Sequence, residues 1–365
     1  MISLADFYRG KRVFVSGHTG FKGAWLCEWL LEVGADVTGY SLSVPTDPAL
    51  FEILGHANRL RDIRGDLRDL PTLKRAIADN KPQLIFHLAA QALVRASYQD
   101  PLETLSTNVL GTAHVLEAAR DQKGLLALVN VTSDKCYENR EWSFGYREVD
   151  PMGGADPYSA SKGCAELVFS AYARSFFNRS ATAIASARAG NVIGGGDWAK
   201  DRLIPDCVRA WSKNETPILR NPASVRPWQH VLEPLGAYLE LGVALCDPKK
   251  RASTAGEAFN FGPEHDAFAP VDQVVREFQT HWPSVRHEYL PPNEAAAQPH
   301  EAKLLKLSCE KALDTLAWHP TLRFKEALEL TARWYRAFYA GSSNMRELSA
   351  EQIRSYMAST RERRR

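Results

Sequence analysis

Residues 13–23 read VFVSGHTGFKG, a short apolar run that leads into three glycines spaced G-x-x-G-x-x-G. The run predicts a buried strand, and residues 21–33 have the pattern of a helix. In such a strand–turn–helix, Gly17 permits the tight turn, Gly20 lets the backbone approach a pyrophosphate, and Gly23 lets helix and strand pack closely. The free N–H groups of the helix N-terminus favour phosphate as well. The stretch therefore predicts a dinucleotide-binding turn.

The rest of the first half alternates apolar runs with helical patterns. Strands are expected at 36–42, 59–64, 84–88, 125–132 and 181–188, and helices at 70–79, 101–120 and 158–177. Buried strands separated by helices indicate a parallel sheet with right-handed crossovers. The second half is less regular, with helices expected at 231–246, 270–281, 324–339 and 349–357.

We therefore predict an α/β fold, a doubly wound parallel (Rossmann-like) sheet with a smaller C-terminal lobe. Residues 1–190 are expected to form the nucleotide-binding domain. Residues 191–365 are expected to form mostly a substrate-binding lobe, with some segments returning to the first domain.

Composition excludes several classes of partner. The 365 residues are 45% hydrophobic and 24% charged, with a formal net charge of +2, so no nucleic-acid partner is expected. The six cysteines are scattered without metal-ligand spacing, which predicts reduced thiols, no metal site and a cytoplasmic protein. No stretch approaches the ~20 apolar residues of a membrane helix, and no signal-peptide pattern opens the sequence.

The residues expected around the adenosine are less decisive. The second strand ends in Ser41 without the acid that usually holds the ribose, which leaves NAD and NADP open. Asp66 and Leu67 follow the third strand, where an aspartate can accept a hydrogen bond from the adenine amino group. Asp66 as a helix cap is the alternative.

Two groups of residues predict oxidation and elimination chemistry. Tyr158 and Lys162 form a Y-x-x-x-K pair on one helix face, where the ammonium favours tyrosinate and lowers the phenol pKa from ~10. Ser133, Asp134 and Lys135 follow a strand at the sheet edge where α/β folds bind ligands. Ser133 can bond a substrate hydroxyl, and Asp134 with Lys135 forms an acid/base couple. A surface pair and a solvated turn are the alternatives.

Together with HLAAQ at 87–91, NVLGT at 108–112 and RPWQHV at 226–231, these motifs resemble the extended short-chain dehydrogenase/reductases of sugar-nucleotide metabolism. The resemblance spans essentially the whole chain. It implies NAD as cofactor. The implied contacts are Gly17, Thr19, Gly20, Phe21, Lys22, Gly23, Ser41, Asp66, Leu67, Ala89, Ala90, Tyr158 and Lys162.

Within that superfamily the chain is most similar to the CDP-D-glucose 4,6-dehydratases. Ser-Asp-Lys at 133–135 is the sharpest sign, because the related dTDP-glucose dehydratases carry Thr-Asp-Glu there. The resemblance implies that Tyr158 takes the C4 hydroxyl proton and that Asp134 protonates the departing C6 hydroxyl. Lys135 either removes the C5 proton or stabilises the enolate. Bacterial surface-polysaccharide synthesis is the implied setting.

The same resemblance supplies candidates for binding CDP-glucose and for assembly. Helices around 100–120 and 158–177 would form the four-helix interface of a homodimer, although the second lobe can equally cover those faces. Arg226 as a salt bridge between domains, and Lys200 and Arg202 as a solvated loop, are alternatives. The substrate candidates are Gln91, Asn108, Arg188, Asn191, Lys200, Arg202, Arg226 and His300.

Two other functions compete with dehydration. A sugar-nucleotide epimerase or decarboxylating relative shares the glycine-rich turn and the Tyr158–Lys162 pair, but does not need Asp134 and Lys135. A non-catalytic dinucleotide sensor on the same fold has little use for Tyr158 and Lys162. Fold alone does not separate these functions.

Overall fold

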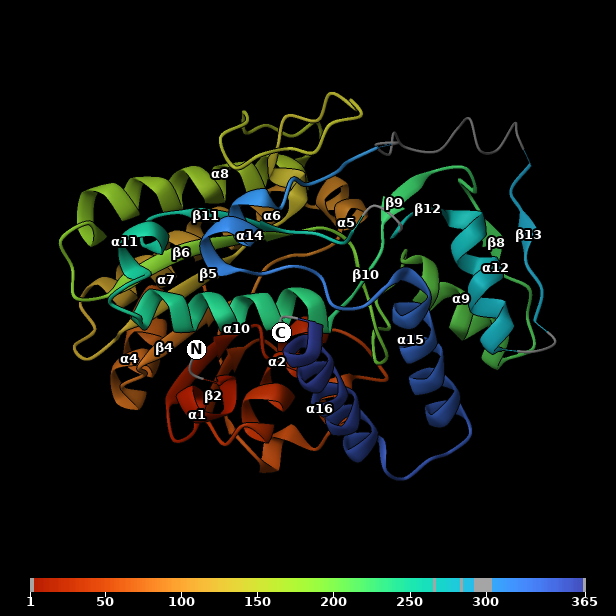
Figure 1. Cartoon of the computed structure of the whole chain (residues 1–365), viewed down its shortest axis with the longest axis horizontal. Coiled ribbons are helices and arrows are strands. Elements are labelled where there is room, and N and C mark those ends of the chain that lie inside the picture. Colours follow the sequence, from red (N-terminus) through yellow and green to blue (C-terminus); the bar gives the residue numbers. More distant parts are fainter. Residues whose placement is uncertain (1–2, 265–266, 283–284, 292–303, 364–365) are drawn as a thin grey trace.

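The computed structural model describes residues 3–264, 267–282, 285–291 and 304–363. Its centre is a sheet of seven parallel strands in the order β11-β6-β5-β4-β1-β2-β3, with helices on both faces (Figure 1). The strands are β1 (Arg12–Ser16), β2 (Asp36–Ser41), β3 (Arg61–Arg64), β4 (Leu84–His87), β5 (Ala127–Val131), β6 (Ala183–Ala189) and β11 (Ala258–Phe261). The predicted α/β class with a doubly wound parallel sheet is confirmed.

Each face of the sheet has its own apolar core, because alternate side chains of a strand point to opposite faces. Val13 and Val15 of β1 pack on one face, and Phe14 packs on the other. The first face is covered by α2 (Phe21–Glu32) and α10 (Leu232–Cys246). The second face is covered by α4 (Leu70–Asn80), α7 (Gly111–Arg120) and α8 (Pro157–Tyr172).

The long helices expected at 101–120 and 158–177 are present, each with one π-helical turn. The first consists of α6 (Pro101–Leu105), the π turn Ser106–Leu110 and α7. The second consists of α8 followed by the π turn Ala173–Phe177. Shorter elements of the first half are α1 (Leu4–Tyr8), α3 (Leu50–Ile53), α5 (Val94–Gln99) and 3₁₀ turns at His56–Asn58 and Asp134–Cys136.

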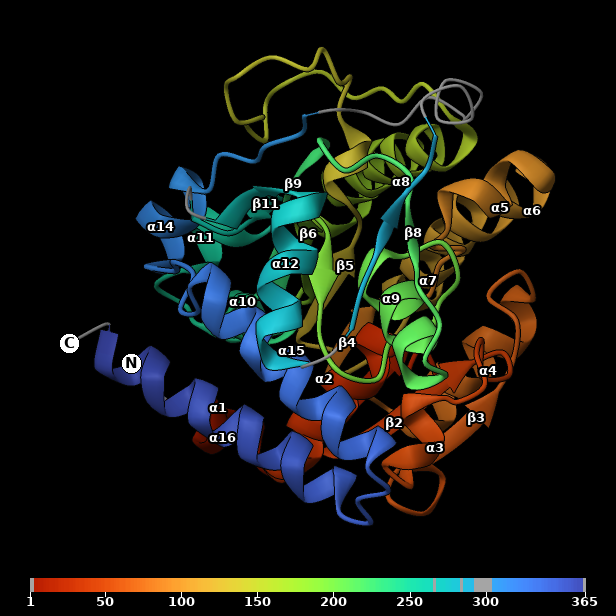
Figure 2. The ribbon, with the colours of Figure 1, turned by 90° about the vertical axis from the view of Figure 1, so that its right-hand side faces the viewer.

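The second half builds a smaller layer beside the carboxyl ends of the strands (Figure 2). Its ladders pair β7 (Val192–Ile193) with β10 (Gln229–His230), β9 (Val225–Pro227) with β12 (Phe268–Pro270), and β8 (Ile218–Leu219) with β13 (Glu288–Tyr289). Between them the chain returns to the sheet, where α10 packs beneath β5 and β6, and β11 pairs with β6. The remaining helices are α9 (Leu203–Ser212), α11 (Arg251–Thr254), α12 (Val271–His281), α14 (Glu310–Leu316), α15 (Phe324–Tyr339) and α16 (Met345–Arg363).

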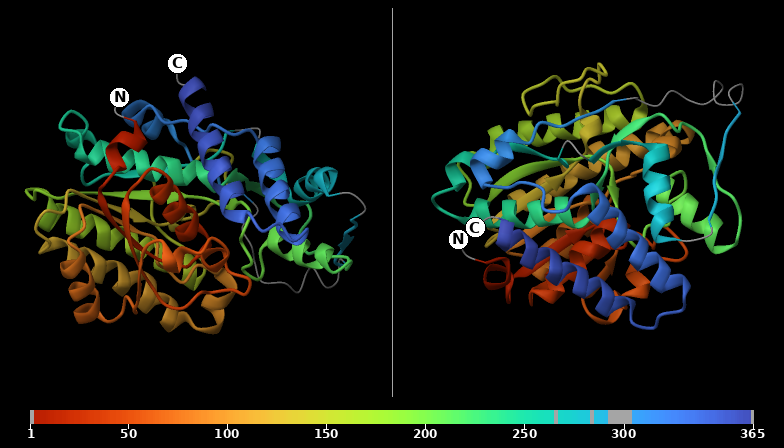
Figure 3. Two further views of the ribbon diagram at one scale, coloured as in Figure 1. Left: turned by 90° about the horizontal axis from the view of Figure 1, so that it is seen from below. Right: turned by 45° about the vertical axis from the view of Figure 1, so that its right-hand side comes forward.

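A buried carboxyl group holds the last helix, α16, against α10. α16 lies against α2 (Figure 3), and Tyr356 on α16 donates a hydrogen bond of 2.9 Å to Glu233 on α10. The Glu233 carboxyl also accepts hydrogen bonds from the backbone N–H groups of Thr321 and Leu322. Burial raises the pKa of Glu233 to about 7, although these hydrogen bonds oppose the shift.

This buried acid predicts a pH-dependent stability. The folded chain keeps a proton on Glu233 that the unfolded chain releases above about pH 4.5. The contribution of Glu233 to the free energy of unfolding therefore falls as pH rises from about 4.5 to about 7. Glu233→Gln lacks that loss. The melting temperature of the variant minus that of the parent should therefore increase between about pH 5 and about pH 8. Glu329→Gln, at an exposed position on α15, is the control, and a difference independent of pH would contradict the prediction.

Candidate active site

A cleft of about 1700 Å³ lies at the carboxyl ends of the strands, between the sheet and the second-half layer. Its walls come from the turn after β1, the ends of β2, β4 and β5, the start of α8 and the loops that follow β6. Every candidate residue that the structure describes lines this cleft except Asn108 and Arg188. His300 lies outside the described residues.

The glycine-rich turn has the close backbone packing that a pyrophosphate site needs. Gly17 has φ +80°, and a Cβ there would lie 2.7 Å from the backbone of Ala89. A Cβ on Gly23 would lie 2.0 Å from the carbonyl oxygen of Gly17, so only glycine lets α2 approach β1 this closely. A Cβ on Gly20 would meet its nearest atom at 3.4 Å, which leaves open space in front of the N-terminus of α2. These features fit a dinucleotide.

At the expected adenosine end, the polar side chains already bond one another. Thr19 Oγ1 lies 2.8 Å from Ser41 Oγ at the end of β2. Asp66 accepts 2.6 Å and 2.8 Å hydrogen bonds from the guanidinium and backbone N–H of Arg68. Both Ser41 and Asp66 line the cleft, so hydroxyl and carboxyl oxygens are available to a ribose and a base there.

Tyr158 and Lys162 lie on the first two turns of α8, whose N-cap Asp156 accepts from Ser159 N–H at 2.9 Å. The Lys162 ammonium is 5.9 Å from the centre of the Tyr158 ring. Burial raises the pKa of Tyr158 to about 12, opposed by a hydrogen bond with Ser133. The sequence predicted a lowered pKa, which is wrong for this structure because desolvation of the phenol outweighs the other effects. Burial lowers the pKa of Lys162 to about 8.

The turn Ser133–Asp134–Lys135 brings its acid/base couple to the floor of the cleft. Ser133 Oγ donates to Asp134 Oδ1 at 3.0 Å, and Lys135 Nζ donates to the same oxygen at 3.4 Å. Lys135 Nζ also lies 3.5 Å from Asn191 Oδ1, which follows β6. Asp134 is buried and Lys135 is partly exposed along the cleft. A carboxyl group and an amine therefore stand together beside Tyr158, and water elimination requires one proton donor and one proton acceptor.

The substrate candidates divide into two groups. Asn191, Lys200, Arg202 and Arg226 line the part of the cleft formed by the second half, and Gln91 lines it beside β4.

Asn108 and Arg188 do not reach the cleft. The side chain of Asn108 bonds the backbone of Gln91 and the hydroxyl of Ser161, at 2.8–3.0 Å, so it holds the wall of the cleft from behind. Arg188 is buried in β6 and pairs with Glu166 at 2.7 Å. Its prediction as a substrate ligand is wrong, because an internal carboxylate already holds its guanidinium.

Sequence reasoning missed a partly buried, long-range contact of Lys22. Lys22 Nζ donates to the hydroxyl of Tyr238 on α10 at 3.4 Å, and burial, with the charge of Arg202, lowers its pKa to about 7. Tyr238 lies 216 residues away in the chain, so no local pattern pairs it with Lys22. Glu166 was missed too, although its i+4 spacing from Lys162 was a readable signal.

Comparison with known proteins agrees with this geometry. Residues 14–331 match the family described as GDP-mannose 4,6 dehydratase. A CDP-glucose 4,6-dehydratase of Salmonella typhimurium is 49% identical over 97% of this chain and 98% of its own. The chain belongs to the nucleotide-sugar 4,6-dehydratases of the extended short-chain dehydrogenase/reductase superfamily. The family expected from the motifs is confirmed.

Solved structures place this 4,6-dehydratase among the same folds. A dTDP-glucose 4,6-dehydratase from Streptomyces venezuelae, solved with NAD bound, is 26% identical with a TM-score of 0.73 and covers 89% of this chain and 97% of its own. A UDP-glucose 4-epimerase from Thermotoga maritima shares the fold at 20% identity and a TM-score of 0.75, covering 90% and 99%. Within the described part of the dehydratase, no group of three or more His, Cys, Asp or Glu residues can hold a metal ion. No helix there is long and apolar enough to cross a membrane.

Two glycine substitutions separate packing from phosphate binding. Gly23→Ala forces α2 away from the turn, so it should lower stability by about 1–3 kcal/mol and also weaken dinucleotide binding. Gly20→Ala has room in the protein itself and should keep its melting temperature, while its methyl group lowers dinucleotide affinity by roughly tenfold or more. Calorimetric titration and thermal melting measure both. Equal behaviour of the two variants would refute the assignment.

Proposed function

We propose that this 4,6-dehydratase converts CDP-D-glucose to CDP-4-dehydro-6-deoxy-D-glucose and water with bound NAD. The observation that carries the proposal is the Ser133–Asp134–Lys135 turn standing beside Tyr158 and Lys162 in one cleft. The Salmonella relative named for CDP-glucose supports the choice of nucleotide.

NAD bound in the cleft would supply a hydride acceptor for oxidation at C4 and a hydride donor for reduction at C6. Tyr158 takes the proton of the C4 hydroxyl as tyrosinate, the form that the nearby Lys162 ammonium favours against the effect of burial, and Ser133, which bonds Tyr158, bonds the same hydroxyl. The ketone formed at C4 acidifies the C5 hydrogen. Lys135 removes that proton or stabilises the resulting enolate, and Asp134 protonates the departing C6 hydroxyl, so one water leaves. The reduction at C6 is completed when C5 takes a proton back from the group that removed it.

The residues of the glycine-rich turn fit the pyrophosphate of NAD, and Ser41 with Asp66 fits its adenosine. Lys162 is placed to hold the nicotinamide ribose while its charge faces Tyr158. We assign this role to residues 1–190, completed by the segments that return from the second half. Residues 191–365 mostly supply the substrate lobe.

The cations of the second half fit the diphosphate of a nucleotide sugar. Arg226 and Lys200 line the cleft, and a guanidinium binds phosphate oxygens through two parallel hydrogen bonds. Arg202 already pairs with Asp197 at 2.8 Å, so we assign it to shaping the loop as well as to the substrate.

We also propose a cytoplasmic homodimer that serves bacterial surface-polysaccharide synthesis. Leu102, Leu110 and Leu167 lie on the paired long helices with exposed fractions of 76%, 55% and 60%, which supports an interface there. All six cysteines are free, in keeping with a reducing compartment.

The direct test is mass spectrometry of CDP-glucose and dTDP-glucose after incubation with the protein and catalytic NAD⁺. We expect CDP-glucose to lose one water without net formation of reduced cofactor. Loss of water from dTDP-glucose alone would move the nucleotide assignment. Unchanged masses for both would reject dehydration, and NMR of the sugar would then detect epimerisation.

Two substitutions should separate the half-reactions. Tyr158→Phe should lower turnover by about 10²–10⁴-fold without forming reduced cofactor, because oxidation at C4 fails. Asp134→Asn should lower turnover comparably but accumulate reduced cofactor, because oxidation precedes the blocked elimination. Tyr172→Phe, near the end of the same helix, is the control. Absorbance of the reduced nicotinamide measures the difference, and its absence in Asp134→Asn would contradict the assigned order.

A further inference from the structure

Two residues flank the turn that carries the acid/base couple, and both are fixed by buried polar groups. Thr132 precedes Ser133, and its hydroxyl donates to the carboxylate of Glu166. Tyr137 follows Cys136, and its hydroxyl accepts a 2.7 Å hydrogen bond from Arg188 Nη1. The turn is therefore held at both ends by buried hydrogen bonds, through Thr132 at its start and Tyr137 at its end.

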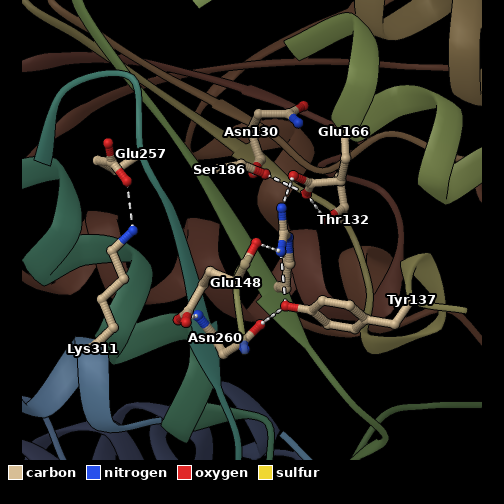
Figure 4. A network of polar contacts seen from close by, with 10 residues as sticks. Asn130, Thr132, Tyr137, Glu148, Glu166, Ser186, Glu257, Asn260 and Lys311 are labelled. Carbon is tan, nitrogen blue, oxygen red and sulfur yellow. Dashed lines mark hydrogen bonds and ion pairs between the residues drawn. The ribbon is translucent and has the colours of Figure 1, made fainter. Parts of the chain in front are cut away.

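Glu166 and Arg188 are themselves an ion pair at 2.7 Å, with exposed fractions of only 3% and 4%. The hydroxyl of Ser186 on β6 donates to Glu166 at 2.6 Å (Figure 4). Burial alone would raise the pKa of Glu166, but the charge and hydrogen bonds of Arg188 and the two hydroxyls hold it below its ordinary value. Glu166 is thus a carboxylate, and its oxygens are oriented by three donors.

The contacts of Tyr137 also reach β11, the strand that the second half of the chain adds to the sheet. The Tyr137 hydroxyl donates to Asn260 Oδ1 on β11 at 2.7 Å. Figure 4 draws this contact. Arg188 Nη1 also donates to the backbone carbonyl of Glu148 at 3.2 Å. The guanidinium therefore cannot swing away from Tyr137 without breaking contacts on two sides.

Stability alone does not explain a buried ion pair of this kind, because the free-energy cost of removing two charges from water is about as large as the attraction between them. Its position supplies an explanation. Glu166 lies one helical turn after Lys162 on the helix that holds Tyr158. The pair consequently connects α8, which carries Tyr158 and Lys162, to the turn that carries Asp134 and Lys135.

We propose that Glu166 and Arg188 are positioning residues that hold the Ser133–Asp134–Lys135 turn in register with Tyr158 and Lys162. The proposal rests on the dehydratase function given above. Tyr158 must reach the C4 hydroxyl while Asp134 and Lys135 reach C6 and C5 of the same sugar, and misplacement by about 1 Å costs about 10²-fold in rate. One buried pair that touches both ends of the turn sets that spacing.

Tyr137→Phe and Arg188→Lys test the inference. The first removes the hydroxyl that Arg188 grips and leaves the ion pair intact. Arg188→Lys keeps the positive charge but removes the guanidinium, whose two nitrogens donate to Glu166 and Tyr137 at once. Tyr146→Phe is the matched control, because Tyr146 is equally buried and stacks on Tyr137 at 5.2 Å, while its hydroxyl bonds Arg140 N–H and Asn139 instead of Arg188.

Two readouts are made on the full-length protein. Hydrogen exchange of the backbone N–H groups in 132–137 reports the turn without any substrate. Turnover of CDP-glucose, with the absorbance of reduced nicotinamide followed during the reaction, reports the chemistry. We expect at least about tenfold faster exchange, about tenfold lower turnover and accumulation of reduced cofactor in both test variants, and none of these in Tyr146→Phe.

Unchanged exchange in Tyr137→Phe and Arg188→Lys would overturn the proposal. So would lower turnover without accumulation of reduced cofactor, because elimination would then not be the impaired step. If the parent protein does not dehydrate CDP-glucose, the proposed function fails by itself. The exchange data then still decide whether the pair holds the turn.

Discussion

A parallel sheet sends the carboxyl ends of all its strands to one edge, and every part of this active site depends on that constraint. The turns after β1 and β5 are distant in sequence, yet they open into the same cleft because β4 alone separates their strands. The chain needs no special contact to bring glycine-rich turn and acid/base couple together. The exact positions of the side chains within the cleft depend on further contacts, and buried polar groups make these contacts.

Lys22, Asp134 and Glu166 illustrate how that placement works. Lys22 and Glu166 are each matched by a hydroxyl or an opposite charge from another element, and Asp134 is matched by Ser133 and Lys135 of its own turn. Such groups cost free energy to bury, so their partners have to be correctly oriented before the fold tolerates them. The same orientation suits catalysis, because a preorganised charge needs no rearrangement when the reaction occurs.

The sequence allowed accurate prediction of whatever a local pattern encodes. Strand β1, helix α2 and the Tyr158–Lys162 spacing depend on neighbours within a few residues, and the structure has them where the pattern indicated. Arg188 was misjudged because its partner, Glu166, comes from a different element. The pKa of Tyr158 was misjudged for a related reason, since burial is a property of the whole fold. Strand β11 went unnoticed because it lies in the less regular second half, outside the strand–helix alternation that marked the equally short β3 and β4.

The late position of β11 in the chain has a consequence for synthesis on the ribosome. Residues 1–190 leave the ribosome first and contain six strands of the sheet, but β6 lacks its outer neighbour until Ala258–Phe261 has emerged. Asn260, which bonds Tyr137, arrives with that strand. Domains usually fold in the order in which they are made, from the N-terminus. The sheet of the nascent first lobe therefore keeps an open edge at β6, and its completion waits for a segment translated about 70 residues later.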